Sequence, residues 1–336
     1  MAKQVDLHLK VEPAMARPSD ESRSKKFPLE SVGLAVAVLV TISVLSFTTE
    51  YFFSFDNARN VSTAISFMGV SAAIATLILI GGGVDLSVAA VMAVAGSTAA
   101  GLLDAGYSAF VAVVVALIAG LLVGIINGFL IASVGINPLI ATIGTGFAVR
   151  GFAYIVIESR ELNIGDQTFL FVGRNDFLGF PLSFLIMLAS FLGVGFVMKR
   201  TVFGQHLYAI GGTPDGRMAA LAGVPVKRRI YQMYAAGGLV AALAGLVLAT
   251  YSASATGNAA MGLELPIIAA VILGGTALGG GRGTVTGTFL GVVLLGVINN
   301  GLTLRNVPYV WLFVVQGSVL LLAVVIDSRR EKRGMK

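Results

Sequence analysis

A few charged side chains stand inside or beside long apolar runs, and they are the residues whose types could do chemistry. Asp85 interrupts the stretch TLILIGGGVDLSVAAVM, residues 76–92, between charge-free runs at 60–84 and 86–103. An ionisable side chain at membrane depth is costly and is usually functional. Asp85 either caps the helix that follows, because Asp-Leu-Ser opening an apolar run is a good helix start, or binds the hydroxyl groups of a ligand. We favour the structural role.

Arg150 and Glu264 are further charges next to apolar residues. Arg150 lies in TGFAVRGF, well inside its run, and needs either a cluster of backbone carbonyls or a carboxylate, which Glu264 or Asp104 could supply. The alternative is that its guanidinium group snorkels to the outer interface. Glu264 comes just before Pro266 and is expected at the external mouth of the protein.

Several kinds of chemistry are unexpected here. The chain has no cysteine, which excludes disulfides, thiolate chemistry and cysteine metal sites. Both histidines, His8 and His206, lie in polar segments, so a histidine-based centre in the membrane is not expected. The glycine-rich stretch at 274–284, GGTALGGGRGT, lacks the Gly-Lys-Thr or Gly-Lys-Ser of a Walker A loop. We therefore expect no metal, no cofactor and no ATP hydrolysis by this chain.

The elements that position these residues are apolar helices. Hydrophobic residues make up 56% of the 336 residues and charged residues only 12%, with a mean hydropathy of +0.89. Soluble proteins average about 25% charged residues. Several uncharged stretches reach the roughly 20 residues that a membrane-spanning helix needs. The expected fold class is an all-α polytopic membrane protein.

Charges, glycine clusters and prolines divide the chain into about ten predicted transmembrane helices. The run from Ala105 to Val149 is too long for one helix and is divided at Gly135-Ile136-Asn137-Pro138, because proline disfavours helix at the residue before it. Glycine interrupts some of the segments and shortens them. The predicted ranges are 31–49, 61–80, 86–103, 107–132, 138–157, 180–198, 230–251, 265–279, 284–303 and 308–326.

The placement of lysine and arginine predicts the orientation. These residues gather at 1–29, at 199–229 and at 328–336. Ten crossings put all three segments on one side, which must be the cytoplasm. We therefore predict a flexible cytoplasmic N-terminal tail over 1–29, a transmembrane domain over 30–327 and a cytoplasmic basic tail over 328–336. The net charge of +6 reflects this topology, and no nucleic-acid partner is expected.

The basic loop at 199–229 reads KRTVFGQHLYAIGGTPDGRMAALAGVPVKRR, and its middle predicts a short helix. Pro214-Asp215 suits the start of a helix, and Gly223-Val224-Pro225 suits its end. A short helix with a small apolar face on the cytosolic surface is a docking element for another protein, and an ordinary solvated loop is the alternative. The expected contact residues are Asp215, Arg217, Ala219, Ala220, Leu221, Gly223 and Val224.

Four stretches, in order, resemble the sugar permeases of ATP-binding-cassette (ABC) importers of the ribose-type branched family. The resemblance covers residues 30 to 330. Thr213 stands where the family usually has asparagine, Ala222 replaces a common serine, and the loop between Gly212 and Gly223 is longer than usual. The matching stretches are GGGVDLS at 81–87, NPLIATIGTGFAVRG at 137–151, GGTPDGRMAALAG at 211–223, and GLELPIIAAVILGGTALGGGRGTVTGT at 262–288 with INNGL at 298–302.

This resemblance implies a monosaccharide permease subunit in a bacterial inner membrane. Its partners would be a separate ATPase subunit, a periplasmic sugar-binding protein, a second permease copy of the same or a sister chain, and membrane lipid. The segment 199–229 would be the coupling loop that seats in the ATPase. The alternative is a secondary transporter driven by an ion gradient, which usually places acids or histidines near the midplane. Here Asp85, Asp104 and Glu264 are expected near helix ends.

Two groups of residues are candidates for the gate and for the pathway. Glycines at helix ends leave backbone groups that must face protein or a water-filled cavity, although close helix packing also explains them. The gate candidates are Gly81, Gly82, Asp85, Gly274, Gly275 and Arg282, with Arg282 either paired with Asp85 or lying against the ATPase. Amides and aromatic rings suit a sugar, although such asparagines more often tie helices together. The pathway candidates are Asn127, Phe147, Arg150, Glu264, Asn299 and Asn300, with Phe152 as a second ring.

Overall fold

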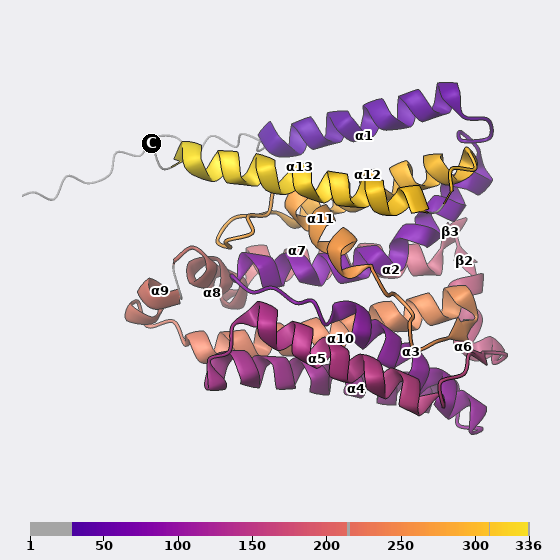
Figure 1. Cartoon of the computed structure of the whole chain (residues 1–336), viewed down its shortest axis with the longest axis horizontal. Helices are drawn as coiled ribbons and strands as arrows, with labels where there is room; N and C mark the ends of the chain where they lie inside the picture. The colour runs from indigo at the N-terminus through magenta and orange to yellow at the C-terminus, as the bar shows by residue number, and fades with distance from the viewer. Residues whose placement is uncertain (1–28, 214–215, 309, 335–336) are drawn as a thin grey trace, which may run out of the picture.

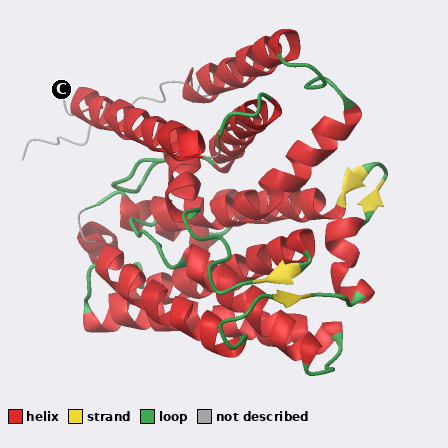
Figure 2. Cartoon of the chain, turned by 45° about the vertical axis from the view of Figure 1, so that its right-hand side comes forward, coloured by secondary structure: helices red, strands yellow, loops and turns green. Residues whose placement is uncertain are grey.

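The computed structural model describes residues 29–213, 216–308 and 310–334, which fold mainly as helices (Figure 1, Figure 2). The strands are two residues long and form two antiparallel pairs, β1 (Leu162–Asn163) with β4 (Ser254–Ala255) and β2 (Asp176–Phe177) with β3 (Phe180–Pro181). The helices are α1 (Leu29–Thr48), α2 (Phe55–Ile80), α3 (Val88–Asp104), α4 (Ala109–Phe129), the π-helical η1 (Leu130–Val134), α5 (Pro138–Val156), α6 (Gln167–Arg174), α7 (Leu182–Arg200), α8 (Val202–Gly211), α9 (Arg217–Leu221), α10 (Val226–Ser252), α11 (Glu264–Leu273), α12 (Val285–Leu304) and α13 (Val310–Gly334).

Each of the ten predicted ranges contains a helix of the described chain. Six helices are long and apolar enough to cross a membrane by length and composition, namely α2, α4 with η1, α5, α7, α10 and α12. The other predicted ranges hold the shorter apolar helices in α1, α3, α11 and α13. The protein is therefore a helical multi-pass membrane protein, and the number of crossings stays a prediction.

The prediction is wrong for the extent of α11. A helix was expected over 265–279, but α11 has only 10 residues and ends at Leu273. A helix of that length rises about 15 Å, half of the roughly 30 Å of the hydrocarbon core. Gly275, with φ of 87°, turns the chain directly after the helix. The irregular segment 256–263 leads into α11, so this part of the chain combines irregular backbone with a half-length helix.

The long helices run between two ends of the molecule, and different short elements lie at each end (Figure 1). α8 and α9 lie at one end, which we call the basal end, and α1 begins and α13 ends on that side as well (Figure 1). The strand pairs and α6 lie at the opposite end (Figure 1, Figure 2). α13 continues through the basic residues to Gly334, whereas residues 1–28 of the predicted N-terminal tail lie outside the described residues. The basal end is thus the end that the charge pattern predicts to be cytoplasmic.

Small residues allow the central helices to pack closely. α4 and α10 cross where Gly120 and Gly124 face Tyr234 and Gly238, and a Cβ atom on either α4 glycine would collide with the α10 backbone. Close contact between small residues is a main source of helix association in membranes. Thr76 of α2 also donates a 2.8 Å hydrogen bond to Thr288 of α12. These contacts hold α2 and α10 as the buried centre around which the other helices lie.

Candidate functional site

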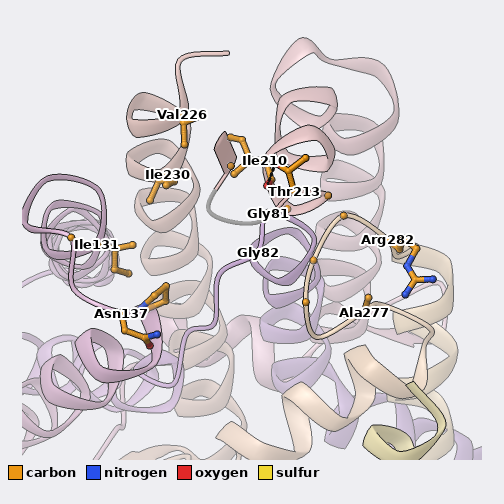
Figure 3. Close-up of a pocket in the computed structure, with 18 of the residues that line it drawn as sticks. Gly81, Gly82, Ile131, Asn137, Ile210, Thr213, Val226, Ile230, Ala277 and Arg282 are labelled. Carbon is orange, nitrogen blue, oxygen red and sulfur yellow. Dashed lines mark hydrogen bonds between the residues drawn. The ribbon is translucent and has the colours of Figure 1, made fainter. Parts of the chain in front are cut away.

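A cavity of about 1100 Å³ opens at the basal end, between the end of α2, the end of α8, the loop 277–282 and the starts of α5 and α10. We call it the basal cavity. Figure 3 shows Ile131 and Asn137 on one side of it, Ala277 and Arg282 on the other, and Gly81 and Gly82 between them. Asn137 accepts a 2.9 Å hydrogen bond from the amide of Leu139, so its side chain caps α5.

Three glycine pairs from distant parts of the sequence meet at the wall of the basal cavity. They end α2, end α8 and lie in the loop between α11 and α12. We call this set the glycine junction, and its members are Gly81, Gly82, Gly211, Gly212, Gly280 and Gly281.

The backbones at this junction are too close for side chains. The amide of Gly281 donates a 2.9 Å hydrogen bond to the carbonyl oxygen of Ile80. A Cβ atom on Gly211 would collide with that same carbonyl and lie 2.7 Å from the nitrogen of Gly281, and one on Gly280 would lie 2.8 Å from the Cα of Gly82. Gly82, Gly280 and Gly281 also have φ of 79°, 85° and 71°, which favours glycine. Three chain segments are therefore joined here by direct backbone contact.

α8 was not predicted, yet it is the element that brings the basic loop to the junction. Thr201 caps it, accepting a 3.2 Å hydrogen bond from the amide of Gly204. Tyr208 donates a 3.0 Å hydrogen bond to the carbonyl oxygen of Gly283, which adds a second link between α8 and the loop before α12. The sequence signal was present in Thr201 followed by Leu207 and Ile210 on one helical face.

The predicted loop helix from Asp215 to Val224 is shorter than expected. α9 covers Arg217–Leu221 and begins after Gly216, whose φ is 63°, while Asp215 lies outside the described residues. Of the predicted contact residues, Arg217, Ala220, Leu221 and Gly223 are exposed, Ala219 is buried and Val224 packs partly against the core. The alanines thus do not form one outward apolar face. Leu221 is 80% exposed and, with Met218, gives α9 its outward apolar surface.

Asp85 lies beside the cap of α3 and is not the cap itself. The helix begins at Val88 with Ser87 as its N-cap residue. Asp85 Oδ1 accepts hydrogen bonds from the amide of Ser87 at 2.8 Å and from its hydroxyl at 2.6 Å. This turn, in which a side chain accepts from the backbone two residues on, stabilises a loop in the same way as a cap. Arg282 is exposed, and no ion pair joins it to Asp85 within the described residues.

Replacing Asp85 tests its structural role in the loop before α3. Asp85→Asn keeps an oxygen that accepts from the Ser87 amide, whereas Asp85→Leu leaves this buried donor unpaired at a cost of about 1 to 3 kcal/mol. We expect more folded Asn variant than Leu variant when purified yield and melting temperature are measured in detergent. Equal losses for the two variants would contradict the structural role.

The side chain of Asn127 on α4 links two other parts of the chain by hydrogen bonds, namely the start of α3 and the helix α5. It is buried, and its amide nitrogen donates a 2.9 Å hydrogen bond to the Ser87 hydroxyl. Its carbonyl oxygen accepts a 2.6 Å hydrogen bond from Thr145 of α5. The Leu86 amide donates a 3.1 Å hydrogen bond to the Thr142 hydroxyl. A polar network therefore fastens the GGGVDLS loop to α4 and α5.

The other predicted pathway amides and rings are spread over the molecule. Asn300 and Asn57 exchange two hydrogen bonds of 2.8 and 3.0 Å, which tie α12 to α2, while Asn299 is half-buried. Phe147 and Phe152 point outward from α5, and both are largely exposed. The structure does not gather these residues into one site.

Arg150 and Glu264 do come together. Arg150 Nη1 donates to the carbonyl oxygens of Gly257 at 3.2 Å and Ala259 at 2.7 Å, and Nη2 lies 3.5 Å from Glu264 Oε1. Both predicted kinds of partner are therefore present. Asp104 pairs with Arg160 instead, at 3.1 Å.

Gly274 and Gly275 do not line the basal cavity, and each has a structural role at the end of α11. The Cβ position on Gly274 is blocked by the backbone of Gly287 and Thr288, so this glycine lets the end of α11 approach the start of α12. Gly275 has φ of 87° and makes the turn after α11. Of the predicted gate residues, Gly81, Gly82 and Arg282 line the cavity.

Comparison with known proteins matches residues 54–324 to the family described as branched-chain amino acid transport system / permease component. The L-arabinose ABC transporter permease protein AraH of Azospirillum brasilense is 35% identical over 306 residues, 90% of each chain. The L-arabinose transport system permease protein AraH of Escherichia coli K12 is 35% identical, over 90% of this chain and 92% of its own. The ribose import permease protein RbsC of Bacillus subtilis 168 is 34% identical, over 90% of this chain and 94% of its own. No solved structure matches.

Proposed function

Because this chain belongs to the permease-component family of branched-chain amino acid transport systems, we propose that it is the transmembrane permease subunit of an ABC importer for a monosaccharide. The observation that carries this proposal is the similarity, along 90% of the chain, to permeases named for arabinose and ribose. Those names favour a pentose over the amino acids of the family description. ATP hydrolysis belongs to a separate ATPase subunit, and a periplasmic binding protein delivers the sugar.

The basal end faces the cytoplasm and receives the ATPase. Lys199, Arg200, Lys227 and Arg228 are exposed there, in keeping with the excess of basic residues on cytoplasmic loops. Met218 and Leu221 of α9, in the same basic segment, are large apolar side chains that are exposed, which suits a protein contact. A second copy of the permease completes the transmembrane pathway.

The glycine junction transmits the movement of the ATPase to the pathway. α9 follows α8 in the chain. The end of α8 contacts the backbone at the end of α2 and the backbone of the loop before α12. If side chains made this contact, they could change rotamer when α8 moves and absorb the displacement. Backbone atoms in direct contact cannot do so, and the segments therefore move together. A displacement of α8 therefore shifts the wall of the basal cavity, which opens or closes it towards the cytoplasm.

Uptake by purified components tests the proposed function. Proteoliposomes that contain this chain and its ATPase, with binding protein outside and ATP inside, are expected to accumulate labelled arabinose or ribose. A catalytically inactive ATPase subunit is the matched control and should abolish the uptake. The rival, a secondary transporter, predicts uptake driven by an ion gradient without ATP. Such uptake would contradict the proposal.

Charge reversal on α9 tests whether this helix contacts the ATPase. The double variant Arg217→Glu with Ala220→Trp places an acid and a bulky ring on the exposed side of α9. We expect roughly tenfold less uptake per ATP hydrolysed, because disrupting a central contact of an interface costs about 2 kcal/mol. The measurement is the ratio of transport to hydrolysis in the same vesicles. Unchanged uptake together with unchanged copurification of the ATPase would refute the proposal that α9 contacts the ATPase.

A further inference from the structure

A second cavity, of about 530 Å³, lies between α2, α7 and α10 and shares no lining residue with the basal cavity. Ile74, Leu77, Val194, Val197 and Val240 give it an apolar wall. We call it the lateral groove. Phe203 and Arg229 lie at its basal end, since α7 ends and α10 begins there.

The groove has the length of one acyl chain in one leaflet. Its lining on α10 runs from Arg229 to Val240, which corresponds to a rise of roughly 16 Å along the helix. The hydrocarbon core of a bilayer is roughly 30 Å thick, so one leaflet contributes about half of this. Gly193 of α7 keeps the groove open, because no atom lies within 4 Å of the position of a Cβ on it.

Arg229 is a half-buried cation that lacks a carboxylate partner in the described part of the chain. Its Nε donates a 2.9 Å hydrogen bond to His206 Nδ1, and its Nη1 donates a 2.8 Å hydrogen bond to Gln232 Oε1. Its guanidinium carbon lies 5.7 Å from the centre of the Phe203 ring. These contacts hold the guanidinium in one orientation, but none of them neutralises its charge.

We propose that the lateral groove binds an anionic phospholipid, with one acyl chain along α7 and α10 and the phosphate at Arg229. The Nη2 hydrogens of Arg229 have no protein acceptor among the described residues, and a phosphate oxygen is the acceptor that a guanidinium group prefers. Lys199 and Arg200 are exposed at the end of α7 and add positive potential at the same end. Basic pockets between membrane helices on the cytoplasmic side suit such headgroups.

The groove and the cation together favour a lipid over other anions. A soluble anion would use Arg229 alone, and a neutral lipid would use only the apolar wall. An anionic phospholipid uses both, because its phosphate accepts hydrogen bonds from Arg229 and its acyl chain covers the apolar wall. This inference depends on the membrane location of the chain and not on which sugar it carries.

Native mass spectrometry of the full-length chain tests the proposal. The purified protein is exchanged into detergent with equal amounts of phosphatidylglycerol and phosphatidylcholine that carry the same acyl chains. The wild-type protein is expected to retain the phosphatidylglycerol preferentially. One basic residue near a membrane surface changes the binding of an anionic lipid by roughly fivefold, so Arg229→Gln should reduce this retention by that factor.

Two matched controls make the result specific. Arg228→Gln removes the same charge from the neighbouring exposed residue, which does not line the groove, and should change the retention by less than twofold. Gly193→Phe fills the groove and should lower the retention of both lipids, whereas Gly317→Phe, also at an open glycine, should not. Absence of a preference for phosphatidylglycerol, equal effects of the two arginine variants, or unchanged binding to Gly193→Phe would overturn the proposal. Gly193→Phe decides the matter if Arg229→Gln does not fold.

Discussion

Gly211→Ala is expected to reduce sugar uptake by roughly 10- to 100-fold although it introduces only one methyl group. The added carbon would collide with the carbonyl oxygen of Ile80 and approach the nitrogens of Gly281 and Gly82, and none of these backbone atoms can rotate away. Overpacking of this kind costs about 1 to 3 kcal/mol. The strain is relieved when the junction separates, and α8 then no longer moves the cavity wall.

Helix propensity alone predicts the opposite result for this variant. Gly211 is the last residue of α8, and alanine is favoured over glycine in helices by about 1 kcal/mol. Gly195→Ala in α7 is the matched control, because a Cβ there has its nearest neighbour at 3.9 Å. Uptake and ATP hydrolysis should be measured for both variants in the same proteoliposomes. A folded Gly211→Ala protein that transports as well as Gly195→Ala would exclude the junction as the coupling element.

Arg150→Met is expected to lower the stability by about 2 to 3 kcal/mol. The Arg150 side chain is 16% exposed, and its removal leaves the Glu264 carboxylate and two carbonyl oxygens without their donor. Breaking a buried pair by removing one partner is destabilising mainly because of the charge that stays behind. The Arg150→Met, Glu264→Gln double variant should therefore recover part of the loss. The measurement is reversible unfolding in detergent.

Arg160 supplies the control for this experiment. It pairs with Asp104 at 3.1 Å, but both side chains are 56% exposed. An exposed pair typically contributes less than about 1 kcal/mol, so Arg160→Met should be nearly neutral. If Arg150→Met and Arg160→Met lower the free energy of unfolding by similar amounts, the partial burial of Arg150 does not make its contacts more stabilising than an exposed ion pair.

Local sequence patterns were sufficient to predict most helices. Pro138 stands at the first turn of α5 with Asn137 as its cap, and this is the break that separates α4 from α5. Apolar runs bounded by charges or glycines locate the other helices in the same way, because lipid requires every backbone group to be hydrogen-bonded within its own segment. α11 was overestimated because glycines in an apolar run can also lie inside a membrane helix, whereas Gly274 and Gly275 follow its last residue, Leu273.

The contacts between distant segments could not be predicted. The glycine junction joins residues near positions 81, 211 and 280, and nothing in any one of these stretches specifies the other two. The same holds for the lateral groove, whose apolar wall combines residues of α2 and α7 with residues of α10, the helix that carries Arg229. Asp85 was assigned to the right loop but two residues from the true cap, because an aspartate that accepts from the backbone two residues on resembles an N-cap in sequence.

The central claim is that the loop 199–229 lies in the cytoplasm and is moved by the ATPase bound to it. Labelling of a single cysteine on α9 tests this claim most directly. The natural chain has no cysteine, so Leu221→Cys, at an 80% exposed position, gives one reporter thiol. A membrane-impermeant maleimide should label it in inside-out vesicles and not in intact spheroplasts, and the assembled ATPase should protect it. Labelling from the periplasmic side, or equal labelling with and without the ATPase, would contradict the mechanism.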